Sequence, residues 1–278
     1  MTDQPDTQLD ARLDALGIKY SLLPYQIPYL KQFLTVGDVR GRDVLEVGGA
    51  LPREIVIDCL GSNSWTCTES PAYDEELGTA NQQTIAGFFS QEGAYRTLLR
   101  NIEDFDSGYD GKFDYIFSIA CFEHIAKFPQ ALDAMYRCLR PGGILFSMFS
   151  PLWSSHSGHH LYHIQIPERF ARDATTPILL PWEHLLKNRR TLHQDLEQRF
   201  DRAFADELIY HTYNSPHINR YFTEDFVHII NLSKFHVTKM GRSFFWPMPE
   251  GYQAALERAC PGYHWFDNQG MYLELLKK

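Results

Sequence analysis

The chain has 278 residues, of which 44% are hydrophobic and 22% are charged, and it carries a formal net charge of −9. This balance is typical of a protein that buries a core, whereas an enzyme that acts on nucleic acid usually carries a basic stripe. The local basic cluster here is confined to residues 187–190. We therefore expect no nucleic-acid partner.

The five cysteines form no CxxC pair and fall mostly in apolar runs, which predicts reduced, buried thiols. No run reaches the roughly 18 apolar residues that a membrane span needs, and the first ten residues are polar and acidic. We expect a cytoplasmic protein with no membrane partner. The oligomeric state stays open, with a homodimer as the candidate assembly.

Residues 1–39 read as a polar tail followed by helical material interrupted by Pro24 and Pro28. From residue 40 onward, short apolar strands alternate with helices. The expected strands are residues 43–47, 65–68, 96–99, 112–118, 144–149, 235–240 and 271–276. The expected helices are residues 53–60, 75–91, 128–140, 190–209 and 223–232.

This alternation predicts an α/β fold with a doubly wound, mostly parallel, seven-stranded sheet. The alternation stops over residues 151–222, which are rich in His, Trp, Tyr and Pro. We expect that segment to be a lid inserted between strands five and six. Residues 223–278 then complete the sheet with a helix and the last two strands.

Polar residues follow the first, second and fourth strands, at the edge where an open parallel sheet binds its ligands. Strand one runs into Glu46, Gly48 and Gly49, and strand two ends on Glu69. Glycine lets the backbone approach a ligand closely, and an acidic residue can accept two hydrogen bonds from a ribose diol. These features suit an adenosine nucleoside.

A dinucleotide enzyme would carry GxGxxG after strand one, because its helix N-terminus binds a pyrophosphate. The loop here reads GGALPR and lacks that pattern. The carboxylate of Glu46 would repel a phosphate but can serve an ammonium or sulfonium group. The loop therefore fits S-adenosylmethionine better than NAD.

The motifs VLEVGG, TES, NIEDF, FDYIFSIACFEHI and LRPGGILF together resemble the class I S-adenosylmethionine-dependent methyltransferases that act on small molecules. The resemblance covers residues 40–150 and the last two strands, and it implies the Rossmann-like methyltransferase fold. One departure is the glycine loop, because the family usually has ExGxGxG and only Gly48 keeps its place. Residues 40–150 would form the cofactor-binding core.

The resemblance implies a set of cofactor contacts, all on strand ends or the loops that follow them. Glu46, Gly48 and Gly49 would face the methionine part, and Glu69 would hold the ribose hydroxyls. Ile102 and Glu103 would flank the adenine. The segment from Ser118 through Ala120 to Glu123 would lie along the cofactor and the reacting methyl group.

Four histidines gather at the start of the lid, namely His156, His159, His160 and His163. They could bind a metal, supply a general base, or hydrogen-bond a polar acceptor. A metal is the least favoured of these, because the cluster has no carboxylate or cysteine beside it, so we expect none. As base we favour His160, followed by His159 and by His124 after strand four.

Two further stretches of the lid, residues 180–185 and 213–220, are expected to form pocket walls for the acceptor. The candidate acceptor-binding residues are His156, Trp182, His184, Asn219 and Arg220. Loose similarity of these stretches to enzymes of bacterial polysaccharide and secondary-metabolite pathways favours O-methylation of a small molecule or glycan. N- or C-methylation, and a binding module without catalysis, remain the alternatives.

Overall fold

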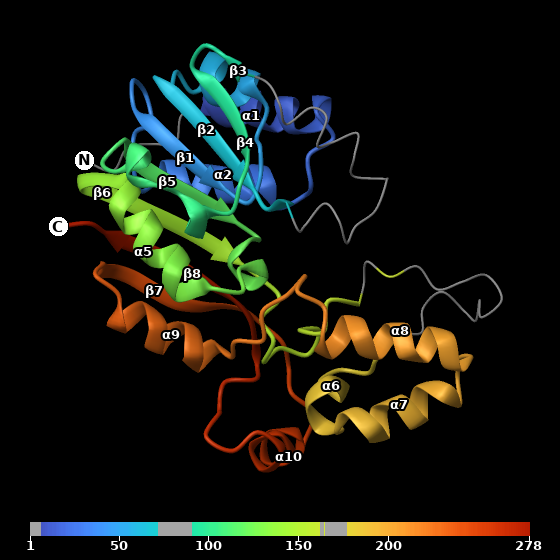
Figure 1. Ribbon diagram of the computed structural model, residues 1–278. Coiled ribbons are helices and arrows are strands. Elements are labelled where there is room, and N and C mark those ends of the chain that lie inside the picture. The colour runs from blue at the N-terminus through green and yellow to red at the C-terminus, as the bar shows by residue number, and fades with distance from the viewer. Residues whose placement is uncertain (1–6, 72–90, 162–163, 165–176) are drawn as a thin grey trace.

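The computed structural model describes residues 7–71, 91–161, 164 and 177–278, and within them an eight-stranded sheet forms the centre of the molecule (Figure 1). The strand order is β3-β4-β2-β1-β5-β6-β8-β7. The strands are β1 Asp43–Val47, β2 Ser64–Glu69, β3 Gln91–Glu92, β4 Tyr95–Leu99, β5 Phe113–Ile119, β6 Leu139–Phe149, β7 His236–Phe245 and β8 Asn268–Leu276.

The five strands from β4 to β6 are parallel, and β8 runs antiparallel to both of its neighbours, β6 and β7. The predicted doubly wound, mostly parallel sheet is therefore confirmed. The two-residue β3 pairs antiparallel with the edge strand β4 and is an addition to the seven expected strands. Strand β1 is buried along nearly its whole length, as expected for a central parallel strand.

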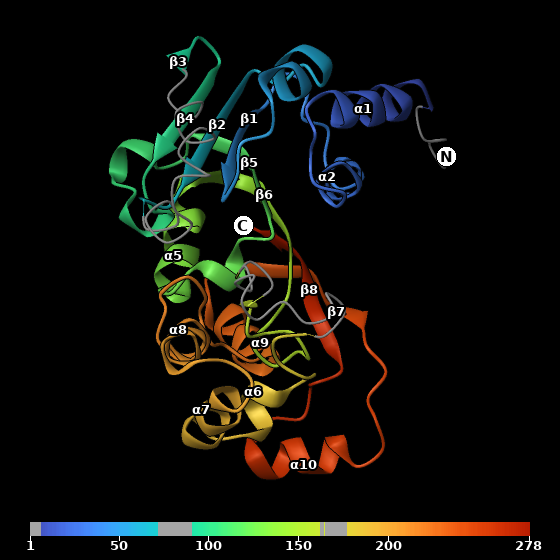
Figure 2. The ribbon, with the colours of Figure 1, turned by 90° about the vertical axis from the view of Figure 1, so that its right-hand side faces the viewer.

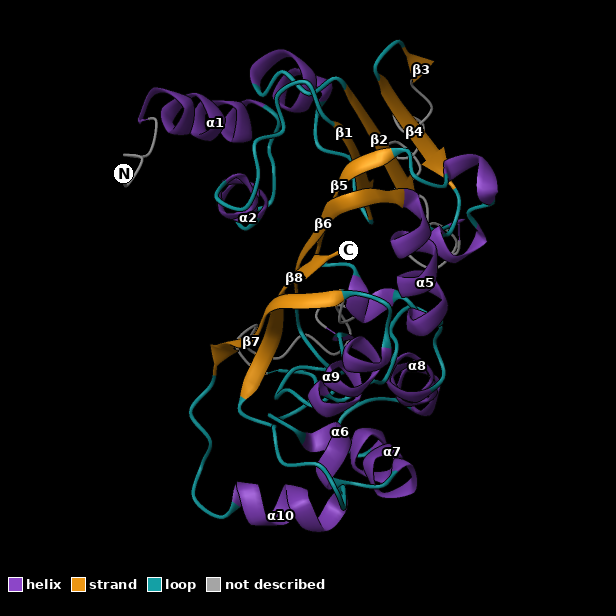
Figure 3. Cartoon of the chain, turned by 90° about the vertical axis from the view of Figure 1, so that its left-hand side faces the viewer, coloured by secondary structure: helices purple, strands orange, loops and turns teal. Residues whose placement is uncertain are grey.

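Helices cover both faces of this sheet, with α1 and α2 on one side and α5 and α9 on the other (Figure 3). Each layer closes over its own apolar cluster. Helix α5 shows why, because its apolar residues repeat at helical spacing and are all buried against the strands. The helices are α1 Thr7–Lys19, α2 Gln26–Leu34, α5 Phe128–Cys138, α6 Glu183–Leu186, α7 Arg189–Glu197, α8 Arg202–Tyr213, α9 Thr223–Leu232 and α10 Tyr252–Ala259.

Shorter helical turns follow the carboxyl ends of several strands. They are the π-helix η1 Glu54–Cys59 and the 3-10 turns η3 Ile102–Asp104, η4 Ser107–Tyr109 and η5 Phe122–His124. None of the helices in the described part of the chain is long and apolar enough to cross a membrane.

Helices α6, α7 and α10 lie beyond one edge of the sheet (Figure 2). Helices α7 and α8 bury an apolar cluster of their own, which includes Leu192, Leu196, Phe204 and Leu208. The expected single helix over 190–209 is wrong, because the chain breaks between Glu197 and Arg202. Asp201 caps the second helix there by accepting a hydrogen bond from the Phe204 backbone N–H.

Two other helix predictions differ from the structure. Pro28 does not interrupt a helix but lies in the first turn of α2, where its missing N–H costs no hydrogen bond. The expected helix over 75–91 falls almost entirely on residues outside the described ranges.

Candidate cofactor and acceptor site

A cavity opens at the carboxyl ends of β1, β2, β4 and β5, the edge at which an open parallel sheet binds its ligands. The loop before α9 closes one side of it. The lining residues are Val47, Gly48, Thr68, Glu69, Ser70, Asn101, Ile102, Glu103, Cys121, His124, Ile125, Ala126, Pro216 and His217.

A second cavity adjoins the first, since the two share Gly48, Glu69, Cys121 and His124. Its other lining residues are Tyr25, Gln26, Glu46, Gly49, Ile119 and Ala120. The structure thus brings the predicted methionine, ribose and adenine contacts to the walls of one continuous site. Neither Tyr25 nor Gln26 was expected there, because the sequence shows only the apolar face of helix α2.

Gly48 has a φ of +79°, a conformation that glycine adopts without strain. A Cβ atom at this position would collide with the Cys121 side chain. The close approach of strand β1 to the turn after β5 therefore requires glycine. Ala120, on that turn, has a φ of +47° although it is not glycine, so the backbone is strained where the two cavities meet.

Glu46 is buried beneath these glycines and accepts hydrogen bonds from several donors of the chain itself. Trp65 Nε1 donates at 2.6 Å, the Leu51 N–H lies 3.1 Å from both carboxylate oxygens, and Cys67 Sγ lies at 3.6 Å. Burial raises the pKa of Glu46 to about 7, against the lowering effect of these donors. Glu46 therefore anchors the loop after β1 in addition to lining the second cavity.

Glu69 ends strand β2 and lines both cavities. Its Oε1 accepts a hydrogen bond from the Ser70 N–H at 2.8 Å. Burial raises the pKa of Glu69 to about 7, with Glu46 adding to the rise. An ionised carboxylate can accept several hydrogen bonds, so Glu69 can accept from a diol in addition to the Ser70 N–H.

The predicted adenine contacts lie on the 3-10 turn η3. Ile102 is buried and Glu103 is half-buried, and partial burial raises the pKa of the Glu103 carboxyl. Ser118 has a different position, because it is fully buried and its hydroxyl donates to the Val47 carbonyl at 2.9 Å. It ties β5 to β1 beneath the cavity and does not line it.

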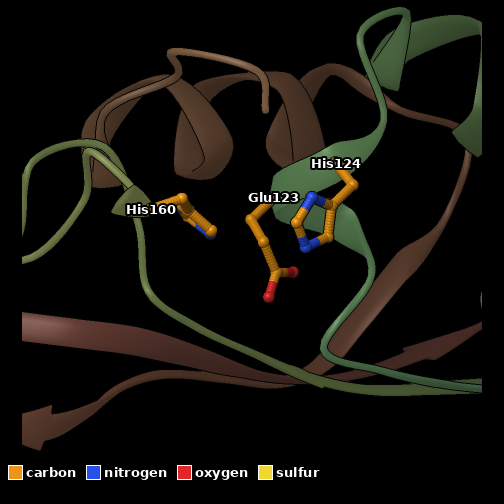
Figure 4. A group of neighbouring side chains, drawn as sticks. All are labelled: Glu123, His124 and His160. Carbon is orange, nitrogen blue, oxygen red and sulfur yellow. The ribbon is translucent and has the colours of Figure 1, made fainter. Parts of the chain in front are cut away.

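The three predicted base candidates have different surroundings in the structure. His124 lines both cavities, while His160 is buried and sits next to it, with ring centroids 5.2 Å apart. Glu123 joins them, and one ligand-type atom from each of the three side chains lies within 4.8 Å of the others (Figure 4). Burial raises the pKa of Glu123 to about 8 and lowers that of His160. His159 instead points at its own turn, where Nδ1 accepts from the Leu161 N–H.

The expected absence of a carboxylate beside the lid histidines does not hold in three dimensions. Glu123 is 37 positions from His160 along the chain yet lies next to it in the fold. The turn over residues 152–160 brings His160 to this position. In that turn, Gly158 packs so closely against the backbone of Leu152 and Trp153 that a Cβ atom would not fit.

The predicted acceptor-binding side chains are mostly engaged within the protein. Trp182 is fully buried and its Nε1 donates to the Phe266 carbonyl, which leaves no ring face for a sugar. His184 is buried and bonds the Trp153 carbonyl, and burial lowers its pKa to about 4. His156 is half-buried and stacks on Trp246 with centroids 4.2 Å apart.

Asn219 and Arg220 hold the loop before α9. The Asn219 side chain donates to the carbonyls of Phe122 and Ile125 at 2.6 and 3.0 Å. The Arg220 guanidinium donates to three backbone carbonyls between Thr212 and Ile218. From the stretch 213–220, the residues that line the first cavity are Pro216 and His217, and the role of this stretch as a wall for the acceptor stays a prediction.

A family model described as a methyltransferase domain matches residues 25–225, more than two thirds of the chain. The chain belongs to this methyltransferase family. The predicted class I identity is confirmed, and the cofactor is S-adenosylmethionine. The site fits this cofactor, because an acidic strand end, a required glycine and a buried apolar side chain at position 102 line the cavity at the carboxyl ends of the strands.

Solved structures of similar fold include other methyltransferases. One from Mesorhizobium loti is 10% identical with a TM-score of 0.48, and the alignment covers 90% of this chain and 97% of that one. Haemonchus contortus phosphoethanolamine N-methyltransferase 2 is 13% identical with a TM-score of 0.47, and the alignment covers 90% of this chain and 52% of that one. Geranyl diphosphate methyltransferase is 13% identical with a TM-score of 0.46, and the alignment covers 100% of this chain and 93% of that one. No curated protein sequence matches the chain.

Proposed function

We propose that this methyltransferase methylates a hydroxyl oxygen of a small-molecule or sugar acceptor. The observation that carries the proposal is the polar cluster of Glu123, His124 and His160, of which His124 lines the cofactor cavity. An oxygen nucleophile must lose a proton during methyl transfer, whereas a neutral amine can attack through its lone pair. A site that gathers proton-accepting groups beside the reacting methyl therefore suits a hydroxyl acceptor.

The same geometry supports an orientation for the cofactor. Glu69 would accept hydrogen bonds from the ribose hydroxyls, and Ile102 with Glu103 would flank the adenine. Glu46, Gly48 and Gly49 line the cavity toward Tyr25 and would face the methionine part. When bound, the cofactor supplies an electrophilic methyl group on a sulfonium.

The residues of the chain then align the acceptor and hold its proton. His124 lines both cavities, and its Nδ1 lies 2.6 Å from the His217 carbonyl, which can only accept a hydrogen bond. Its Nε2 therefore carries the lone pair, in the neutral ring, toward the cluster. We assign the acceptor side to His124, which lines both cavities, with His160 buried beside it. Alignment and exclusion of water supply the remaining rate enhancement.

Binding of S-adenosylhomocysteine, measured by isothermal titration with NAD as the control ligand, tests the cofactor site. We expect Glu69→Gln to weaken that binding by about 10- to 100-fold, because each lost charge-assisted hydrogen bond is worth ~1.5–3 kcal/mol. The matched control is Glu54→Gln, an exposed carboxylate on the neighbouring helix, which should bind as the wild type does. Equal affinity of the Glu69 variant would remove the assignment of the ribose site.

A panel of hydroxyl and amine acceptors, read out by product mass and by formation of S-adenosylhomocysteine, tests the acceptor atom. We expect methylated hydroxyl products from the wild type, and a loss of about 100-fold or more in His124→Gln with unchanged S-adenosylhomocysteine binding. Products methylated only on nitrogen or carbon would overturn O-methylation.

A further inference from the structure

Three potential metal ligands converge in the fold from two distant segments. Glu123 and His124 belong to the turn η5 after β5, and His160 belongs to the turn after β6. One ligand atom from each residue lies within 4.8 Å of the other two. Figure 4 shows the carboxylate of Glu123 between the two imidazole rings.

The two histidines are oriented by the same type of hydrogen bond. Nδ1 of His124 lies 2.6 Å from the His217 carbonyl, and Nδ1 of His160 lies 2.9 Å from the Gly158 carbonyl. A carbonyl oxygen can only accept, so each Nδ1 carries the hydrogen and each neutral ring presents its lone pair on Nε2. Histidines that bind metals usually donate their other ring N–H to such a carbonyl or carboxylate.

Glu123 offers a carboxyl group in a buried position. Its side chain is 2% exposed, and Oε1 accepts a hydrogen bond from the Ser150 N–H at 3.2 Å. Its Oε2 has no hydrogen-bond partner in the part of the chain that the structure describes. A buried carboxylate oxygen without a partner is costly, and a bound cation would compensate it.

We propose that Glu123 Oε2, His124 Nε2 and His160 Nε2 bind a divalent transition-metal ion. Two imidazoles and one carboxylate form a donor set that suits Zn²⁺, Mn²⁺, Fe²⁺ or Co²⁺ rather than Mg²⁺, which prefers oxygen ligands. Ligand bonds of ~2.1 Å place tetrahedral donors roughly 3.4 Å apart, so the widest pair would close by at most about 1.4 Å.

Of the three proposed ligands, His124 lines both cavities, so an acceptor would reach an open coordination position of the ion from that side. The role of the ion in methyl transfer rests on the proposed function. When the ion is bound, His124 Nε2 is a ligand and no longer the base assigned above, so an acceptor hydroxyl that coordinates the ion loses its proton to solvent, which coordination makes easier. The oxygen lone pair then forms the new C–O bond, while the S–CH₃ bond breaks and its electron pair stays on sulfur. Whether the ion binds does not depend on that role.

The neighbouring residues supply the support that a metal site needs. The Asn219 side chain fixes the carbonyls of Phe122 and Ile125, on either side of the two ligands of η5. His160 has a φ of +55°, a strained conformation for a residue other than glycine. The fold holds this strained backbone where the side chain meets Glu123.

The test uses the untagged full-length protein after dialysis against EDTA. Titration with Co²⁺ is followed by calorimetry and by the visible absorption of the bound ion, and Zn²⁺ and Mg²⁺ are titrated in parallel. We expect one Co²⁺ or Zn²⁺ per chain and no Mg²⁺. Glu123→Gln and His160→Gln should each weaken Co²⁺ binding by about 100-fold or more.

The matched control is His184→Gln, which changes another buried histidine that bonds a backbone carbonyl and should bind Co²⁺ as the wild type does. If His160→Gln fails to fold, the half-buried His124→Gln replaces it. Absence of a bound ion in the wild type, or equal affinity in the ligand variants, would overturn the proposal. The acceptor panel separates the two questions, since products methylated only on nitrogen or carbon would contradict the proposed function without affecting the metal site.

Discussion

Glu69 shows at the scale of one residue how a strand end becomes a cofactor contact. Its pKa is raised to about 7 by burial, so the free enzyme binds a proton near neutrality that ribose hydroxyls would displace. The affinity for S-adenosylhomocysteine should therefore rise by up to about tenfold between pH 6 and pH 8. Calorimetry at both pH values checks this, and Glu69→Gln should show a flatter profile. The same rise in the variant would assign the titration to another group.

The site residues that the sequence predicted well are those on strand ends. Glu46, Gly48 and Glu69 reach the cavity because parallel strands must end at one edge of the sheet, whatever the details of packing. The predictions for Trp182, His184 and Arg220 rested on residue type alone. Burial and backbone carbonyls decide what those side chains do, and the sequence does not show either.

At the scale of elements, Asn219 joins the loop before α9 to the turn η5. Its amide group donates to two carbonyls, and the backbone N–H of Asn219 donates to the Glu123 carbonyl at 2.8 Å. We expect Asn219→Asp to lower the free energy of unfolding by ~2–4 kcal/mol, because it places a carboxylate against carbonyl oxygens. Asn219→Ala should lower the free energy of unfolding by less. Urea denaturation measures both changes.

The control for this prediction is Asn214→Asp on the same loop. Asn214 is exposed and its Oδ1 accepts from Arg189, which an aspartate can still do, so its stability should stay close to that of the wild type. If Asn219→Asp proves as stable as this control, the amide does not hold the turn.

Elements with regular periodicity were predictable, and their junctions were not. The strand over 43–47 and the helix over 223–232 have the predicted bounds. The break between α7 and α8 depends on a single capping residue, Asp201, inside a charged sequence that keeps helical spacing. Helix α10 was not expected, because it has only eight residues and follows a proline-rich loop.

For the whole molecule, buried carboxylates such as Glu46 make stability depend on pH. Its pKa is about 7 in the fold and near 4.5 when unfolded, so the folded state holds the proton more tightly. The stabilisation from protonated Glu46 is complete below pH 4.5 and is lost as the pH rises to 7. His184 and His160 have lowered pKa values and act in the opposite direction below pH 6.5, so the wild-type profile alone mixes these effects.

Comparison of the wild type with Glu46→Gln isolates one of the contributions. The variant cannot ionise, so its free energy of unfolding should improve relative to the wild type by about 2 kcal/mol between pH 5.5 and pH 8. Urea denaturation at the two pH values measures the difference. Glu54→Gln is the control, because Glu54 is exposed with a lowered pKa and is ionised in both states across this range. Parallel profiles for the wild type and Glu46→Gln would show that Glu46 is already ionised in the folded protein at pH 5.5, with its three kinds of donor outweighing the cost of burial.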